Sequence, residues 1–252
     1  MTALAIVAAG IIWRHYDRIN DGADPRTLVA RKLYGTYNSL ASAGDYIGVK
    51  TLLDSLEGIY AAIPHYTDSW ESAVILNNHA ALCLTLALYG DSIPQHRNPY
   101  PGMQKDSLID LSERFLNGAM RVYEAMDSLY GGLNEAQIKE DIRPVFLIGL
   151  ETFPAERQEH FLETRAGEIL TALDEKDMRM SVCYNNLGII CSSREDYQGA
   201  MQHYTTALSL WDRNLDAENN LNRLLGQPLK TRHFLQRLFP PKRGSTSKND
   251  SP

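Results

Sequence analysis

The clearest alternation of apolar and polar positions lies between residues 177 and 211. Asp177 is the predicted N-cap of a helix whose apolar residues recur at helical spacing. These residues are Val182, Leu187, Ile190 and Cys191. After a polar turn at 193–197, a second helix is predicted, with an apolar side made of Tyr197, Ala200, Met201, Tyr204, Ala207, Leu208 and Trp211. Two amphipathic helices joined by a short polar turn predict an antiparallel helical hairpin.

Small residues in this hairpin indicate how closely its helices approach. We expect Gly188 and Ala200 to lie where the helices cross, with Ala207 two turns beyond Ala200. A glycine in an exposed helix costs about 1 kcal/mol relative to alanine, so Gly188 suggests a packing requirement.

The residues of this hairpin resemble the tetratricopeptide repeat (TPR). The resemblance rests on Tyr184, Leu187, Gly188, Cys191, Ala200, Tyr204 and Ala207, and Glu195-Asp196-Tyr197 looks like the turn of that family. Tyr184 stands for the usual Trp, Cys191 for an aromatic residue, and Asp212 where Pro is common. The resemblance implies repeat-packing roles for Tyr184, Leu187, Gly188, Ala200, Tyr204 and Ala207. It also implies an all-α fold, a TPR-like α-solenoid of antiparallel helical hairpins.

The other residues of the range 26–225 are predicted to continue this solenoid. Further helices are expected at 26–40, 46–62, 70–89, 106–130, 135–150, 155–173 and 215–225. The turn Gly44-Asp45-Tyr46 mirrors 195–197, which makes the first pair a degenerate repeat. An inserted loop rich in Pro and Gly, 90–103, separates the helices of the second pair. The third pair is atypical, and Pro144 is expected to kink or shift its first helix.

The N-terminal residues 1–19 form a segment of different composition. Residues 1–13 carry no charge, but thirteen helical residues span only about 20 Å of a bilayer core about 30 Å thick. Trp13, Arg14, Tyr16 and Arg18 resemble an interfacial flank. We therefore expect a truncated membrane anchor, with its positive flank and the solenoid in the cytoplasm. The alternative is an apolar helix packed on the first repeat of a cytoplasmic protein.

Charge is unevenly distributed along the 252 residues. The net charge is −6, yet residues 229–252 hold six basic residues and one acidic residue, which leaves an acidic body. This distribution argues against a nucleic-acid partner. Residues 226–252 are predicted to contain a short basic amphipathic helix and then a disordered tail. The apolar residues Phe234, Leu235, Leu238 and Phe239 either cover the last solenoid helix near Leu221 and Leu225 or belong to a segment that touches an anionic surface.

Motifs of catalysis do not stand out. The sequence contains no G-x-S-x-G, HExxH, phosphate-loop or GxGxxG motif, so we predict no enzyme, no catalytic residues, no metal and no cofactor. Cys83, Cys183 and Cys191 suit neither a disulfide framework nor a zinc site and are interpreted as reduced structural thiols.

Asparagines give the one candidate binding surface. Asn78 and Asn186 resemble a residue that faces the concave groove in peptide-binding TPR domains, so Asn78, Asn185 and Asn186 are the candidate peptide groove. The alternative is that Asn is simply common at this position of the repeat. Val182, Asn185 and Ile189 replace the basic residues of a carboxylate clamp, which speaks against binding of chaperone tails. The resemblance implies a protein–protein interaction scaffold with unidentified protein partners, resembling membrane-anchored bacterial TPR proteins. The alternative is a soluble regulatory or accessory subunit of an enzyme complex.

Overall fold

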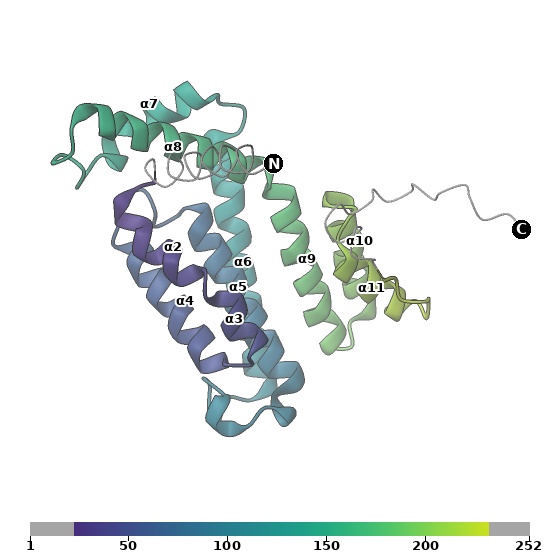
Figure 1. Ribbon diagram of the computed structural model, residues 1–252. Coiled ribbons are helices and arrows are strands. Elements are labelled where there is room, and N and C mark those ends of the chain that lie inside the picture. Colours follow the sequence, from purple (N-terminus) through teal and green to yellow (C-terminus); the bar gives the residue numbers. More distant parts are fainter. Residues whose placement is uncertain (1–22, 232–252) are drawn as a thin grey trace, which may run out of the picture. The chain divides into compact units, whose positions relative to one another are not determined.

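The computed structural model describes residues 23–231, which form helices and contain no strand (Figure 1). In chain order the helices are η1 Pro25–Thr27, α2 Leu28–Tyr34, α3 Tyr37–Ser42, α4 Tyr46–Ala61, α5 Trp70–Tyr89, η2 Gly90–Ser92, η3 Gln95–Arg97, α6 Lys105–Tyr130, α7 Glu135–Phe146, α8 Ala155–Asp174, α9 Lys176–Ser193, α10 Tyr197–Leu210 and α11 Leu215–Leu224. The all-α class predicted from the sequence is confirmed for this part of the chain. The apolar segment 1–19 and most of the tail lie outside the described residues.

The described chain divides into two compact units, each assembled from separate stretches of sequence. The first comprises residues 23–75 and 125–173, and the second comprises 76–124 and 174–231. The boundaries therefore fall within α5 and α6 and before the last residue of α8.

The first unit contains α2, α3 and α4 together with the pair α7 and α8. Ion pairs from Lys139 to Glu163, at 3.5 Å, and from Arg143 to Glu159 show that α7 and α8 run antiparallel. Helix α7 ends at Phe146, so the prediction that it extends to residue 150 is wrong. Pro144 removes one backbone donor from its last turn, and Gly149 then turns the chain away with φ +85°.

The predicted helix at 26–40 is also wrong, because a break separates α2 from α3. Both the N–H and the hydroxyl of Thr36 donate to the carbonyl of Leu33, at 2.9 and 2.7 Å. In a continuous α-helix, that carbonyl would accept a hydrogen bond from the N–H four residues later in the chain. The two bonds from Thr36 compete with this bond, so α2 ends here.

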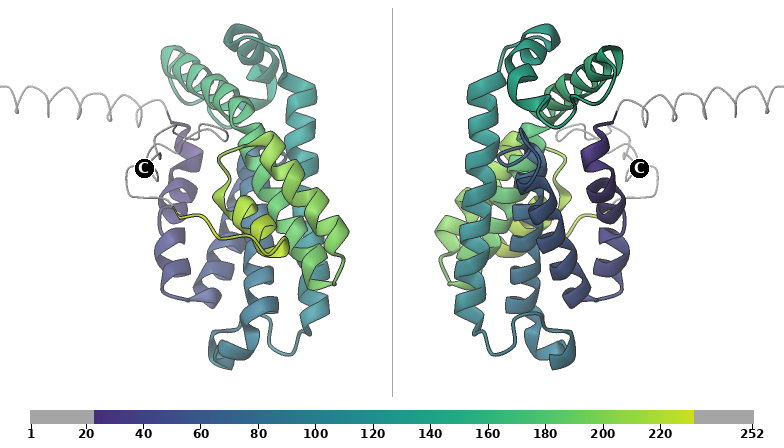
Figure 2. Two further views of the ribbon diagram at one scale, coloured as in Figure 1. Left: turned by 90° about the vertical axis from the view of Figure 1, so that its right-hand side faces the viewer. Right: turned by 90° about the vertical axis from the view of Figure 1, so that its left-hand side faces the viewer.

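The second unit contains two antiparallel hairpins and α11. In the first hairpin, Ser112 of α6 donates to the carbonyl of Ala80 at 2.9 Å, and Phe115 stacks on His79 at 4.9 Å. In the second, Ser181 of α9 donates to the carbonyl of Ala207 at 2.6 Å. Helices α9 and α10 can be followed in green and yellow-green in Figure 2. The hairpin predicted from the sequence is thus present.

Two turns in the chain share one local geometry. Asp45 precedes α4 with φ −84° and ψ 74°, and Asp196 precedes α10 with φ −81° and ψ 76°. Each carboxylate accepts the N–H of a glycine three residues on, at 2.9 Å. The residue before each aspartate has positive φ, at Gly44 and Glu195. The similarity expected between these turns is therefore found in the backbone as well as in the sequence.

Asp177 is not the N-cap of α9, so that prediction is wrong. The helix begins at Lys176 after Glu175, whose side chain makes no capping bond, and Asp177 lies within the first turn. The positive end of the helix dipole stabilises the negative charge of an aspartate anywhere in the first turn. The presence of an aspartate near the start of a helix therefore does not identify it as the cap.

One described segment, Trp70–Ser92, is long and apolar enough to cross a membrane by length and composition. Many of its apolar side chains are buried in the packing of the chain, among them Ala73, Ile75, Ala80, Leu82, Cys83 and Leu84. Core helices meet the same criterion, so this segment carries no membrane argument.

Candidate functional site

The small-residue contact in the second unit is made by Gly188 and Tyr204. A Cβ on Gly188 would lie 2.4 Å from Cε1 of Tyr204, and its three nearest atoms all belong to that ring. Ala200 and Ala207 are fully buried, while Leu187 and Tyr204 are 8% and 3% exposed. Tyr184 is half-buried and stacks on His203 at 5.9 Å. The structure thus places the predicted packing residues in the interior of this hairpin or at its edge.

The predicted groove asparagines lie in a chain of side-chain amides within the second unit. Asn186 donates to Asn77 at 3.4 Å, Asn185 contacts Asn186 at 3.5 Å, and Asn220 donates to Asn185 at 2.9 Å. Asn185 is only 6% exposed. These bonds link α5, α9 and α11, so Asn185 and Asn186 already serve the packing of three helices. Asn78 is half-buried on α5.

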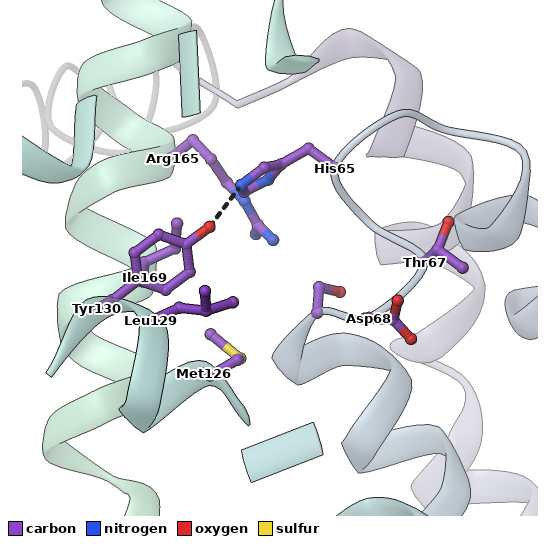
Figure 3. A pocket seen from close by; sticks show the side chains of 9 residues that line it. His65, Thr67, Asp68, Met126, Leu129, Tyr130, Arg165 and Ile169 are labelled. Carbon is purple, nitrogen blue, oxygen red and sulfur yellow. Dashed lines mark hydrogen bonds between the residues drawn. The ribbon is translucent and has the colours of Figure 1, made fainter. Parts of the chain in front are cut away.

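A cavity of about 260 Å³ opens in the first unit, where the loop before α5 meets α6 and α8 (Figure 3). Its lining residues are His65, Thr67, Asp68, Ser69, Met126, Leu129, Tyr130, Arg165 and Ile169. The dashed line in Figure 3 joins His65 Nε2 to the Tyr130 hydroxyl, 3.2 Å apart. Apolar side chains from α6 and α8 thus face a polar loop across this space.

Arg165 is the most unusual residue of this cavity because its charge is almost completely removed from water. Its side chain is 1% exposed and forms a two-pronged ion pair with Glu71, at 2.6 and 3.2 Å. Its guanidinium also lies 4.1 Å from the centre of the Tyr66 ring. Burial alone would raise the pKa of Glu71, but the charge and hydrogen bonds of Arg165 outweigh burial and lower that pKa below its usual value.

Further polar atoms around the cavity are buried. His65 Nδ1, Tyr66 Oη and Arg165 Nε have no hydrogen-bond partner among the described residues. Burial, reinforced by the charge of Arg165, lowers the pKa of His65 to about 4, so its ring is neutral at pH 7. Because Glu71 already neutralises Arg165, the cavity combines buried charge with little net charge, an arrangement typical of structural ion pairs.

A second hollow of the first unit lies between α2, α4 and the start of α5. It encloses about 220 Å³ and is lined by Arg31, Tyr34, Tyr60, Trp70, Glu71, Val74 and Ile75. Tyr34 is 40% exposed at its rim, whereas Tyr60 and Ile75 are buried. Arg31 pairs with Glu168 at 2.5 Å, which leaves the rim with a compensated charge. The hollow is therefore an aromatic and aliphatic depression open to water.

Sequence reasoning missed both sites in the first unit. Arg165 occupies the apolar stripe of its helix, formed by Phe161, Leu162, Ala166 and Ile169, and a charge at such a position was the signal available. Its partner Glu71 is 94 residues away, which no local pattern indicates. Within the described residues, no group of three His, Cys, Asp or Glu side chains could hold a metal ion.

The chain matches no protein family, no curated protein and no solved structure.

Proposed function

We propose that this chain is a helical-repeat protein of the tetratricopeptide type that binds a segment of another protein. The repeat assignment is supported by the shared turn geometry at Asp45 and Asp196 and by the close contact of Gly188 with Tyr204. Repeated turns with one geometry are expected when successive hairpins derive from one structural unit.

Packing within the second unit supports the same proposal. Helix α9 contacts α5 through Asn186 and Asn77, and it contacts α6 through Arg194, which pairs with Asp110 and Glu113 at 2.6 and 2.7 Å. One hairpin thus stacks on the preceding one, and the polar helix α11 follows as a terminal element.

The observation that carries the binding function is the aromatic hollow lined by Tyr34, Tyr60, Trp70, Val74 and Ile75. Interface centres are enriched in Tyr, Trp and Arg, and a partner usually inserts an aromatic or aliphatic side chain into such a depression. A hollow of about 220 Å³ suits one large apolar side chain with its flanking backbone. The partner class is therefore a peptide segment with an apolar anchor residue.

Peptide selection against the full-length protein tests this function. Displayed peptides that bind the wild type should contain a large apolar residue, and Val74→Arg should weaken their binding at least ~10-fold by filling the hollow with charge. Val29→Glu is the matched control, because Val29 is 62% exposed and does not line the hollow. Selected peptides that bind Val74→Arg as well as the wild type would rule out the hollow as the site.

The membrane tether belongs to this proposal as its second element. It rests on the uncharged residues 1–13 and on the flank that contains Trp13, Arg14 and Arg18. Fractionation of cells that express the protein distinguishes a tethered scaffold from a soluble accessory subunit. Recovery only in the soluble fraction would favour the accessory subunit.

A further inference from the structure

Helices α10 and α11 leave an apolar groove uncovered in the second unit. It has a volume of about 480 Å³ and is lined by Tyr197, Gln198, Met201, Leu224 and Leu225. Tyr197, Met201 and Leu225 are 56%, 40% and 50% exposed, although Tyr197 and Met201 belong to the apolar pattern of α10. Leu221, in contrast, packs on the buried cluster of Ala207, Leu208 and Ala217. The apolar stripe of α10 is thus only partly used inside the hairpin.

The chain beyond α11 is held against the side of this helix. Lys230 and Asn219 exchange two hydrogen bonds, from Asn219 Nδ2 to the Lys230 carbonyl at 3.0 Å and from the Lys230 N–H to Asn219 Oδ1 at 2.7 Å. The Lys230 ammonium also pairs with Glu218 at 2.8 Å. These bonds turn the chain back along α11, so the segment that follows starts beside this helix.

The next residues of the sequence have the composition that the groove requires. Phe234, Leu235, Leu238 and Phe239 recur at the sequence spacing of an amphipathic helix, and they follow Lys230 by four to nine residues. Four residues of extended chain span about 13 Å. Leu225 lies about 9 Å along the axis of α11 from Asn219. The first of the four apolar residues can therefore reach the groove without moving Lys230.

Charge favours the same occupant. Arg232 precedes the apolar residues and Arg237 lies among them. Glu195 and Asp196, both exposed, directly precede Tyr197 at the groove. Opposite charges at the edge of an apolar contact orient the two surfaces without having to be buried.

We propose that residues 234–239 of this chain bind intramolecularly in the groove formed by Tyr197, Met201, Leu224 and Leu225. The apolar side chains of the segment enter the groove, and the basic ones remain in water. This proposal does not depend on peptide binding at the aromatic hollow of the first unit.

Oxidation of methionines in the full-length protein tests the proposal. Met201 and Met103 are 40% and 39% exposed in the described chain, so without an occupant in the groove peroxide should oxidise them at similar rates. With the groove occupied, Met201 should react at least ~5-fold more slowly than Met103. The double variant Leu235→Glu/Leu238→Glu should equalise the two rates, and it alters no residue that the structure places in the core. Equal rates in the wild type would overturn the proposal, as would a slow Met201 in the variant.

Hydrogen exchange of the same proteins identifies the occupant. Amides of 234–239 should exchange at least ~10-fold more slowly than those of 244–252, and Met201→Glu should abolish this difference while exchange in α9 is unchanged. Val29→Glu should leave the difference intact. Protection that grows with protein concentration would assign the groove to a second copy, and protection found only with anionic vesicles would assign the segment to a lipid surface. Either result would overturn intramolecular binding.

Discussion

Gly188 and Tyr204 make a close helix-to-helix contact in the second unit, since a Cβ at Gly188 would overlap three atoms of the tyrosine ring, at 2.4 to 3.0 Å. The ring is 3% exposed and has little room to withdraw. The two residues therefore fix the distance between α9 and α10.

Replacement of Gly188 by alanine should destabilise the protein. Overpacking of the tyrosine ring should lower the free energy of unfolding by about 1–3 kcal/mol in denaturant melts. The matched control is Gly58→Ala in α4, where an added Cβ meets nothing within 4 Å. That variant should gain up to about 1 kcal/mol from helix propensity. A stable Gly188→Ala protein would show that α9 and α10 separate easily.

The two capping aspartates should contribute similarly to stability. Asp45→Ala and Asp196→Ala each remove a bond to a glycine N–H, so each should lower the free energy of unfolding by about 0.5–2 kcal/mol. Asp177→Ala should cost only about 0.3 kcal/mol, because Asp177 interacts with the helix dipole without capping. Denaturant melts of the three variants decide this. An Asp177 variant as unstable as the other two would restore Asp177 as a cap.

Arg165 and Glu71 should behave as a buried pair. Arg165→Met leaves the Glu71 carboxylate buried and should cost about 3–5 kcal/mol, whereas Arg165→Met combined with Glu71→Leu should recover much of that loss. Arg143→Met, which breaks a surface ion pair with Glu159, should cost only about 0–1 kcal/mol. Urea unfolding measures all three. Equal costs for Arg165→Met and Arg143→Met would contradict the burial of Arg165.

The stability of the protein should fall between pH 6.5 and about pH 4 because of His65. Burial lowers its pKa to about 4 in the folded chain, so the unfolded chain binds the proton first as the pH drops. The contribution of His65 to the free energy of unfolding is fully present above pH 6.5 and is lost as the pH falls toward 4.

His65→Gln should flatten this part of the stability profile, as measured by urea unfolding at successive pH values. His96→Gln, at an exposed position of η3, is the control. The pKa of Glu71 is lowered, so its contribution to the free energy of unfolding is lost at lower pH than that of His65. The effects of the two residues on the stability profile can therefore be told apart. An unchanged slope in His65→Gln would mean that His65 is solvated.

The sequence predicts those elements whose patterns are strong and local. Helix α5 was expected at 70–89 and has these bounds, since a long apolar pattern is bounded by turn residues. The break at Gly35 could not be predicted, because it depends on which of several nearby donors forms a hydrogen bond with the Leu33 carbonyl. The same holds for the buried pair of Arg165 with Glu71, which forms only after distant helices pack. Asn185 shows a related limit, since its role depends on Asn220 of another helix.

The division of α5 and α6 between the two units bears on how the chain is made. The first unit needs residues up to 173, and the second needs residues 76–124 as well as those from 174 onward. On the ribosome, neither unit can close before most of the protein has emerged, although domains usually fold in order from the N-terminus. Until then the apolar helix α5 lacks some of the packing contacts that it makes in the folded protein. A chaperone would therefore be needed most at this nascent stage.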